Sequence, residues 1–509
     1  MENSQKTGFI MRALNGIERV GNKLPHPVTL FFIFAAAVVI LSAIFSAIGL
    51  SVEDPINDGE TIAVKNLLSS EGILYLFESA VTNFTNFAPL GTVLVTMLGI
   101  GIAERSGLIS ASLRGLVTSV PRTLMTAALV FGGVMSSMAA DAGYVVLTPL
   151  GAVLFAGLGR HPLAGLAAAF AGVSGGFSAN LLLTSLDPLL GGLTKDAAAI
   201  INPAYAEGIN YAMNYYFMFV SVFLLTILGT LVTDKIVEPR LGTYQGSVKE
   251  DVNYLRPEEK RGLWGALIAF LITIAGMAIL VLPSWGPLRA GHANLIDAPF
   301  FGTLVPVILI IFFIPGLVYG LITKEIKNDK DVANQLSETM ATMGSYIVLA
   351  FAAAQFVAYF SESNLGTVLA VKGAAFIDAT GFKGIPLILT FIAVSGFINL
   401  FIGSASAKWA IMAPVFVPMM MLSGYSPEFT QLVYRIADST TNVISPLMPY
   451  FAIVIAFAQK YDKKVGIGTL ISTMLPYSIV FTIGWVAMLL IWMLIGLPIG
   501  PGTPTVYTQ

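Results

Sequence analysis

The 509-residue chain has no cysteine, which excludes a disulfide framework and thiol chemistry. Charge is scarce as well: only 11% of the residues are charged, against roughly a quarter in soluble domains, and 56% are hydrophobic. The 27 basic and 29 acidic residues nearly balance, which argues against a nucleic-acid partner. The apolar segments are continuous, as in membrane helices, rather than alternating, as in a β-barrel. We therefore predict an all-α polytopic membrane protein.

Motifs of catalytic sites are also missing. The sequence has no H-E-x-x-H, P-loop or G-x-S-x-G pattern. Its three histidines are not spaced to share a metal ion. We therefore expect neither an enzyme nor a self-contained ATP-driven pump, and no cofactor other than a coupling ion.

About nine apolar segments are long enough to cross a bilayer, which takes roughly 20 residues. They are predicted at 28–50, 72–103, 163–190, 212–237, 262–281, 300–322, 335–360, 427–457 and 470–497. Cytoplasmic loops are enriched in Lys and Arg, and this bias places the segment 1–27 in the cytoplasm and the tail 498–509 in the periplasm. No cleavable signal peptide is recognised, so the first span is expected to direct the chain to the membrane.

Two further apolar stretches, 121–158 and 386–422, are interrupted by small and polar residues. Neither half of either stretch is long enough to cross a bilayer, so we predict two re-entrant hairpins. An offset of 265 residues relates them: it places Pro121 on Pro386, Pro149 on Pro414, Gly159 on Gly424 and Pro162 on Pro427. Paired interrupted segments of this kind are typical of the binding site of a transporter.

The offset extends beyond the hairpins and predicts two repeats, 72–237 and 335–497. The first span, 28–50, belongs to a scaffold, and 238–322 holds a cytoplasmic loop and two linking spans. Five crossings separate the starts of the repeats, so the second repeat is inverted. The spans that follow the hairpins contain helix-weakening Gly or Pro and are expected to be broken. The site is therefore predicted between the two hairpin tips.

Charges inside spans mark candidate site residues, because each costs roughly 2.5–3.5 kcal/mol at a span centre. Arg435 and Asp438 are three residues apart and can share a helix face. Either they form an internal ion pair, or Arg435 meets a substrate anion while Asp438 holds a cation or carries a proton. Asp187 is either an ordinary helix-terminal acid before Pro188 or a proton or cation site.

Hydroxyl and amide oxygens suit Na⁺, whereas free N–H groups at helix ends suit a carboxylate. The predicted Na⁺ ligands are Asp141, Ser404, Ser406, Asp438, Thr441 and Asn442. The predicted substrate-binding and translocation residues are Asp187, Trp409, Pro427, Arg435, Lys408 and Asn180. Trp409 either stacks on an aromatic substrate or packs in the interior, and Pro427 could simply begin a span.

Several motifs resemble the AbgT family of p-aminobenzoyl-glutamate transporters. They are E-R-V-G-N-K-L-P-H-P at 18–27, S-S-M-A-A-D-A-G at 136–143, G-F-S-A-N-L-L-L-T-S-L-D at 176–187 and Y-R-I-A-D-S at 434–439. The resemblance implies a homodimer of nine-span protomers, each with a dimerising scaffold and a transport core. It also associates Asp187, Trp409, Pro427 and Arg435 with substrate and translocation. Lys408 departs from the pattern associated with the family.

The function implied by the resemblance is ion-coupled secondary transport of p-aminobenzoyl-glutamate, p-aminobenzoate or similar aromatic anions. Some members are described as importers, others as exporters of sulfonamide antimetabolites. The coupling ion is Na⁺ or H⁺, and the partners are the small aromatic anion, the lipid bilayer and a second copy of the chain. The residues alone also allow a passive channel for organic anions, although opposed hairpins favour alternating access.

Overall fold

A computed structural model describes residues 25–54, 60–139, 143–244, 255–295, 298–446, 448 and 450–507. Almost all regular structure in these residues is helical. The one described sheet is an antiparallel pair, β1 (Ser51–Glu53) and β2 (Thr61–Ala63), in which Val52 lies opposite Ile62. The predicted Na⁺ ligand Asp141 lies outside the described residues.

The helices follow one another through the first repeat and into the linking segment. They are α2 (Pro27–Ala47), α3 (Ser70–Glu78), α4 (Ala80–Thr85), α5 (Ala88–Arg105), α6 (Leu108–Thr118), α7 (Met125–Met135), α8 (Thr148–Gly157), α9 (Pro162–Phe170) with the π-helical turn η4 (Ala171–Gly175), α10 (Leu186–Ala198), α11 (Pro203–Gly208), α12 (Tyr215–Val232) with the π-helical turn η5 (Thr233–Val237), α13 (Glu238–Leu241), α14 (Pro257–Val281) and α15 (Leu304–Thr323).

The second half continues with helices of similar lengths. They are α16 (Asp329–Thr342), α17 (Gly344–Glu362), α18 (Leu365–Thr380), α19 (Ile385–Asn399), α20 (Ala405–Leu422), α21 (Pro427–Asn442), α22 (Phe451–Gln459) and α23 (Ile467–Ile495).

Eight described helices are long and apolar enough to span a membrane, or nine if the bent pair α6–α7 counts as one span. Seven of the eight match predicted spans, and the eighth, α20, is the second arm of the second hairpin. The two remaining predicted spans, 163–190 and 427–457, consist of shorter helices separated by breaks, as their Gly and Pro content indicates. The prediction of an all-α membrane fold with two re-entrant hairpins in an inverted repeat is confirmed.

Some predicted boundaries were wrong. The segment 72–103 is not one helix, because it is divided into α3, α4 and α5 around Ser79 and Asn86. The segment 335–360 is likewise divided at Met343, where the amphipathic α16 meets the apolar α17. Helices α6 and α18 lie outside the predicted spans, because each is too short or too polar to be recognised as a membrane span from the sequence.

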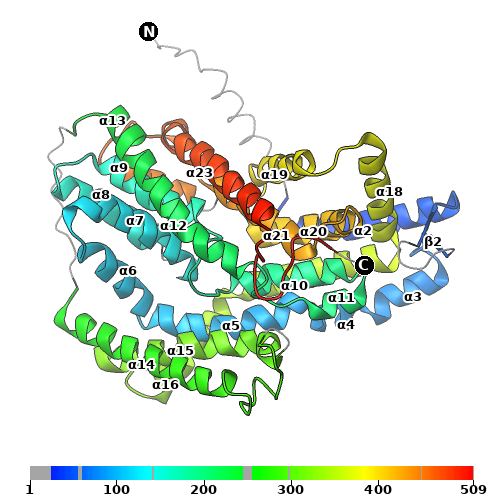
Figure 1. The fold of residues 1–509 in the computed structure, drawn as a ribbon, viewed down its shortest axis with the longest axis horizontal. Helices are drawn as coiled ribbons and strands as arrows, with labels where there is room; N and C mark the ends of the chain where they lie inside the picture. Colours follow the sequence, from blue (N-terminus) through cyan, green and yellow to red (C-terminus); the bar gives the residue numbers. More distant parts are fainter. Residues whose placement is uncertain are drawn as a thin grey trace, which may run out of the picture.

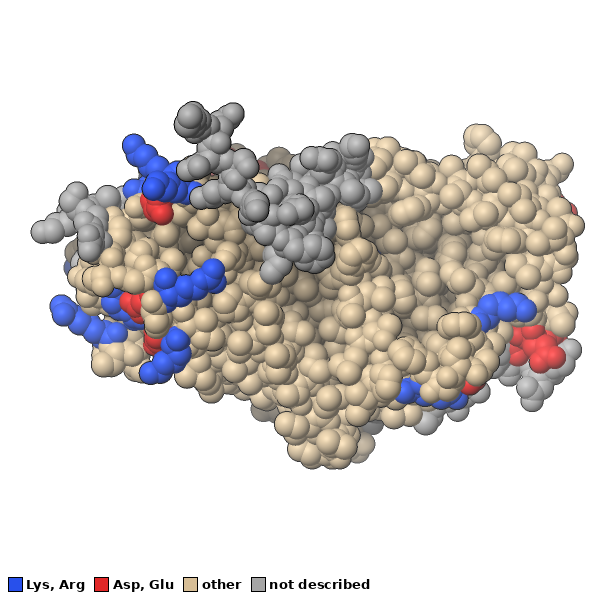
Figure 2. Space-filling model, turned by 90° about the horizontal axis from the view of Figure 1, so that it is seen from above, with Lys and Arg blue, Asp and Glu red and all other residues tan. Residues whose placement is uncertain are grey.

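The charged residues on the visible face gather at the two ends of the long axis and leave an uncharged band between them (Figure 2). One end, here the α13 end, carries an ion-pair cluster in which Arg160 contacts Asp234 and Glu238. The other, the β-sheet end, carries the pair Lys65–Glu362 at 2.8 Å. A wide uncharged band between two polar ends is the pattern expected of a protein that spans a bilayer along this axis.

The repeat offset reappears in the helix boundaries. Helix α9 begins at Pro162 and α21 at Pro427, while α10 begins at Leu186 and α22 at Phe451. Both differences equal 265. Gly159 and Gly424 share this offset and both adopt positive φ, +74° and +89°, in the turn before the broken span. Left-handed backbone favours glycine, so the same turn is used in both repeats.

Helices α10 and α21, one from each broken span, lie in the middle of the molecule, whereas α9 extends toward the α13 end (Figure 1). Helix α21 contacts α10, α19, α20 and α23, and α10 also contacts α5. Along one edge α14, α15 and α16 form a separate layer against α5, and α2 packs on α17. The hairpin arms α7 and α8 pack on α9, and α19 and α20 on α21, so each hairpin is held by the broken span that follows it.

Candidate functional site

The two breaks meet in the interior. The first lies between Gly175 and Leu186, and the second between Asn442 and Phe451. The first break is bonded to the last turns of α21, just before the second break, since the backbone N–H of Ser178 donates to Oγ of Ser439 at 3.2 Å. Irregular backbone at membrane depth is stable only where protein or a watery cavity satisfies its polar groups. The arrangement therefore creates a polar centre inside an otherwise apolar core.

A cavity of about 310 Å³ lies between the hairpin tips and the two breaks. Ser137 comes from the first tip, Ser404 and Ser406 come from the second, and Ser185 and Asn442 come from the broken spans. The remaining wall is apolar or aromatic, with Tyr144, Phe177, Leu186, Leu189, Gly403, Ala405, Met448 and Tyr450. The volume falls near the lower end of small-molecule pockets, roughly 300–1,000 Å³.

The aromatic wall of the cavity is preorganised. Tyr144 and Tyr450 stack with their ring centroids 4.3 Å apart and their planes 7° apart. Behind them Oγ of Ser174 donates to Sδ of Met448 at 3.3 Å. Tyr144 belongs to the first hairpin and Tyr450 to the second break, so the stack connects the two repeats. Parallel aromatic rings offer a surface against which a flat aromatic molecule can pack.

No charged side chain lines the described part of the cavity wall, yet two helices begin there. Helix α10 begins at Leu186, and α20 begins at Ala405 with Ser404 as its N-cap residue. The free N–H groups of a helix N-terminus carry partial positive charge and are a common binding site for anions. The cavity therefore combines an aromatic surface with two electropositive helix ends.

Two buried ion pairs lie beside the cavity. Nη1 of Arg435 lies 2.8 Å from Oδ1 of Asp187, and Nη2 donates to the carbonyl of Ser178 at 2.9 Å. The other Asp187 oxygen accepts from the backbone N–H of Thr184 at 2.8 Å. The alternative in which Arg435 pairs with Asp438 is therefore wrong: side chains three apart on a helix can share a face, but a partner on α10 comes closer.

Lys408 neutralises Asp438 in the second pair. Its ammonium group contacts both Oδ1 of Asp438 and Oδ1 of Asn399, and the lysine is completely buried. Nδ2 of Asn399 donates to Oγ1 of Thr441 at 2.7 Å and to Oδ1 of Asn442 at 2.8 Å. The cation of Lys408 thus lies among the oxygens predicted to hold Na⁺. A Na⁺ ion does not fit beside Asp438 while the ammonium is there.

The remaining predicted residues have structural partners. Trp409 is fully buried, stacks on Tyr434 at 4.4 Å and donates its indole N–H to Oγ1 of Thr194 at 2.9 Å. Its ring does not line the cavity, so the structure gives it no contact with a ligand there. Pro427 occupies the first turn of α21 after the N-cap residue Ser426. Asn180 donates to Oγ of Ser137 at 2.8 Å, which ties a break to a tip.

The structure therefore brings Ser404, Ser406 and Asn442 to the cavity, whereas the other described candidates do not line it. The sequence reasoning missed Tyr144, Phe177, Tyr450 and Asn399. Tyr144 stands 265 residues before Trp409, and both side chains are buried, but only Tyr144 lines the cavity. Asn399 is the last residue of α19, the first arm of the second hairpin, and only its position beside α21 shows that it belongs to the site.

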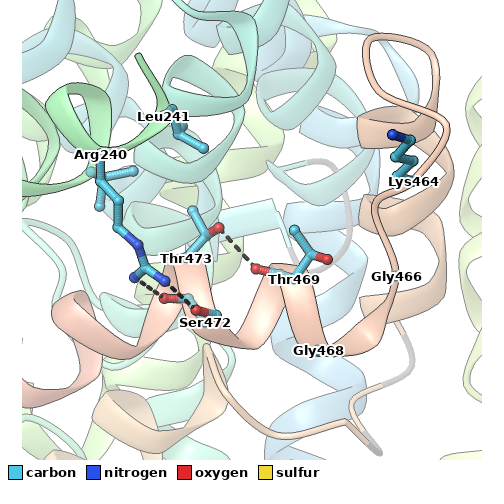
Figure 3. A pocket seen from close by; sticks show the side chains of 9 residues that line it. Arg240, Leu241, Lys464, Gly466, Gly468, Thr469, Ser472 and Thr473 are labelled. Carbon is cyan, nitrogen blue, oxygen red and sulfur yellow. Dashed lines mark hydrogen bonds between the residues drawn. The ribbon is translucent and has the colours of Figure 1, made fainter. Parts of the chain in front are cut away.

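A second cavity, of about 580 Å³, lies at the α13 end, away from the predicted residues (Figure 3). Arg240 projects over the first turns of α23 and donates to the carbonyl of Ser472 at 3.1 Å and to its hydroxyl at 2.6 Å. Lys464 lies across the opening in the same view. This surface pocket shares no residue with the cavity between the tips.

Comparison with known proteins identifies the fold. The family described as "AbgT putative transporter family" matches residues 12–507. The chain belongs to the AbgT family. A curated relative, the p-aminobenzoyl-glutamate transport protein of Escherichia coli strain K12, is 42% identical over 487 residues, which cover 96% of this chain and 95% of the relative.

Two solved AbgT-family structures are similar over almost the full length. The YdaH transporter of Alcanivorax borkumensis has a TM-score of 0.89 and 46% identity, covering 94% of this chain and all of that one. MtrF of Neisseria gonorrhoeae has a TM-score of 0.91 and 49% identity, covering 97% of this chain and all of that one. MtrF is described as illuminating a class of antimetabolite efflux pumps. This AbgT-family chain is therefore a multi-pass membrane transporter.

Proposed function

We propose that this AbgT-family chain is an ion-coupled secondary transporter of p-aminobenzoyl-glutamate, p-aminobenzoate and similar aromatic anions. The cavity between the hairpin tips is the main observation in favour. Its stacked Tyr144 and Tyr450 suit a benzoyl ring, and the N-termini of α10 and α20 suit a carboxylate. The name of the Escherichia coli relative supplies the chemical class of the substrate.

The transport core works as an alternating-access device in this proposal. Each hairpin is held by a broken span, and the ion pair Arg435–Asp187 joins the two broken spans across the repeats. Small movements of either hairpin tip would then open the cavity to one side of the membrane at a time. We place the N-terminus in the cytoplasm of a bacterial inner-membrane protein, because the basic loops favour that orientation.

Two protomers form the transporter in this proposal, with the layer of α14, α15 and α16 as part of a stationary scaffold. Efflux of sulfonamide antimetabolites is the proposed physiological direction, and the description of MtrF supports it. The coupling ion is H⁺ or Na⁺. The position of Lys408 beside Asp438 weighs against Na⁺ at that place.

The test is transport of labelled p-aminobenzoyl-glutamate into proteoliposomes, with pH and Na⁺ gradients imposed separately. A coupled transporter accumulates the label above its external concentration under one of the gradients. Equilibration without accumulation under both gradients would overturn the proposal in favour of a passive anion channel. A deletion strain tested for sulfonamide sensitivity addresses direction, since loss of an exporter increases sensitivity whereas loss of an importer does not.

A further inference from the structure

Asp187 and Asp438 lie beside the cavity, whereas another buried acid lies away from it, at the start of α21. Glu428 is 4% exposed, and Oη of Tyr205 donates to both of its carboxylate oxygens at 3.3 and 3.1 Å. In the described part of the chain no Lys, Arg or His forms an ion pair with it, in contrast to Asp187 and Asp438. A buried carboxylate without a cation costs several kcal/mol, so its charge calls for a neutralising ion.

We propose that Glu428 is a proton-binding site of this transporter, with Tyr205 as the residue that positions its carboxyl group. A proton fits the place better than a metal ion. Hard cations such as Ca²⁺ take six or more oxygen ligands, whereas Glu428 has only the hydroxyl groups of Tyr205 and Ser426 beside it. A protonated carboxyl, in contrast, needs only one or two hydrogen-bond partners.

The C-terminal residues 499–507, here the C-terminal strap, cover this place. The N–H of Ser426 donates to the carbonyl of Thr505 at 3.1 Å, and Oγ of Ser426 donates to that of Pro504 at 2.7 Å. Tyr507 packs edge-on against Tyr205 at 5.1 Å and accepts from Nδ2 of Asn202 at 2.9 Å. Figure 1 shows the C-terminus beside α11, which carries Tyr205. The strap therefore shields Glu428 from solvent.

The groups that face Glu428 are almost all neutral. From α11 and the strap these are Tyr205 and Tyr507. The charged residues of the helices packed on α21 have other partners: Asp187 pairs with Arg435, and Lys408 with Asp438. On α10, Lys195 donates to the carbonyl of Glu207 at 3.3 Å. Asp196, also on α10, accepts from the backbone of Ala88. Because the surroundings are neutral, a proton is the ion that compensates the negative charge of Glu428.

A chain of buried hydrogen bonds leads from Glu428 toward the second hairpin. Its backbone carbonyl accepts from Nδ2 of Asn214 at 2.9 Å, and Oδ1 of Asn214 accepts from Nε2 of Gln431 at 2.9 Å. Oε1 of Gln431 accepts from Oγ1 of Thr194 at 2.5 Å, and Thr194 accepts from the indole of Trp409. The chain starts at the backbone of Glu428 rather than at its carboxyl group, so it links the position of the first turn of α21 to the arm that carries Ser404 and Ser406 to the cavity.

This inference rests on the proposed function only for its role in coupling, so the experiment has two independent readouts. The first is infrared spectroscopy of the purified full-length protein over a pH series. Wild type should show a carboxylic-acid C=O band at pH values where exposed carboxyl groups are already ionised, and the wild-type-minus-Glu428→Gln difference spectrum should isolate this band. Tyr205→Phe should keep the band with a shifted midpoint. Glu207→Gln, an exposed acid on α11, is the matched control and should leave the band unchanged.

The second readout is transport in proteoliposomes. Glu428→Gln should still exchange substrate in the absence of a gradient. Its accumulation of substrate under a pH gradient should fall at least tenfold. Absence of this band from the wild-type-minus-Glu428→Gln difference spectrum would overturn the proton site, whatever the transport result. Full pH-driven accumulation by Glu428→Gln would overturn its role in coupling. Absence of accumulation by wild type under any gradient would instead contradict the proposed function and leave the infrared result intact.

Discussion

Arg435 and Asp187 connect the two inverted repeats at their broken spans, with Nη1 and Oδ1 2.8 Å apart in the buried core. Each belongs to a different repeat, so the pair forms only when both breaks are in place. Nε of Arg435 has no partner among the described residues and remains available as a donor. The pair therefore neutralises two charges in the membrane interior and also fixes how the breaks lie relative to each other.

The first prediction concerns the stability of this pair. Arg435→Met leaves the Asp187 carboxylate buried and uncompensated, which should lower the free energy of unfolding by about 3–5 kcal/mol. The double variant Arg435→Met with Asp187→Leu should recover most of that loss, because no unpaired charge remains. Unfolding of the detergent-purified proteins by denaturant measures both. A double variant as unstable as the single one would contradict the pairing.

The second prediction concerns the aromatic wall. Tyr450→Leu removes the ring that stacks on Tyr144 and should weaken binding of p-aminobenzoyl-glutamate by about 0.5–1.5 kcal/mol, a factor of roughly two to ten. Binding calorimetry with the purified protein measures the change. Phe397→Leu, at an exposed ring elsewhere, is the control. Unchanged affinity in Tyr450→Leu would exclude the stacked tyrosines from the substrate site.

The third prediction concerns the ammonium of Lys408. Lys408→Ala empties the place between Asp438 and Asn399 and leaves a carboxylate and amide oxygens that suit Na⁺. We expect NaCl to raise the unfolding temperature of this variant more than choline chloride does, and to have no such specific effect on wild type. A thermal shift assay in the two salts compares them. Equal shifts in both salts would show that the vacated place does not hold Na⁺.

The fourth prediction concerns the crossing of the first hairpin and its broken span. A Cβ atom at Gly172 would lie 2.4 Å from the carbonyl oxygen of Val130, on α7, which is far too close. Gly172→Ala should therefore separate α7 from η4 and lower the stability by about 1–3 kcal/mol. Gly276→Ala, on α14 with open space around it, is the control and should cost nothing. The same measured stability in both variants would contradict the close crossing.

The sequence predicted those elements whose signal is local. The offset of 265 residues located the starts of α9 and α21, because a proline three residues after a glycine recurs in both repeats and proline is favoured in the first turn of a helix. The sequence could not predict the divisions around Ser79 and Asn86, because an apolar stretch has the same hydropathy whether it forms one helix or three. Short helices such as α6 give no length signal either.

The sequence predicted which segments form the candidate site, but not which side chains pair with one another. Hairpin tips and broken spans do surround one cavity, but the partner of Arg435 comes from α10, and spacing along α21 says nothing about a neighbouring helix. The sequence left open whether Trp409 stacks on a substrate or packs in the interior; it packs on Tyr434 of α21, and Lys408 is buried as well. Which face of a tip points inward is decided by packing, and a single sequence does not contain that information.

The C-terminal strap also bears on the order of events during synthesis. Residues 499–507 are made long after some of the segments they contact: Thr503 donates to the carbonyl of Met213, and Pro501 accepts from Asn210, each almost 300 residues earlier in the chain. Chains fold from the N-terminus while they are made. The loop before α12 and the start of α21 must therefore wait with open hydrogen bonds until residues 499–507 have been made, and the strap then completes this part of the transport core.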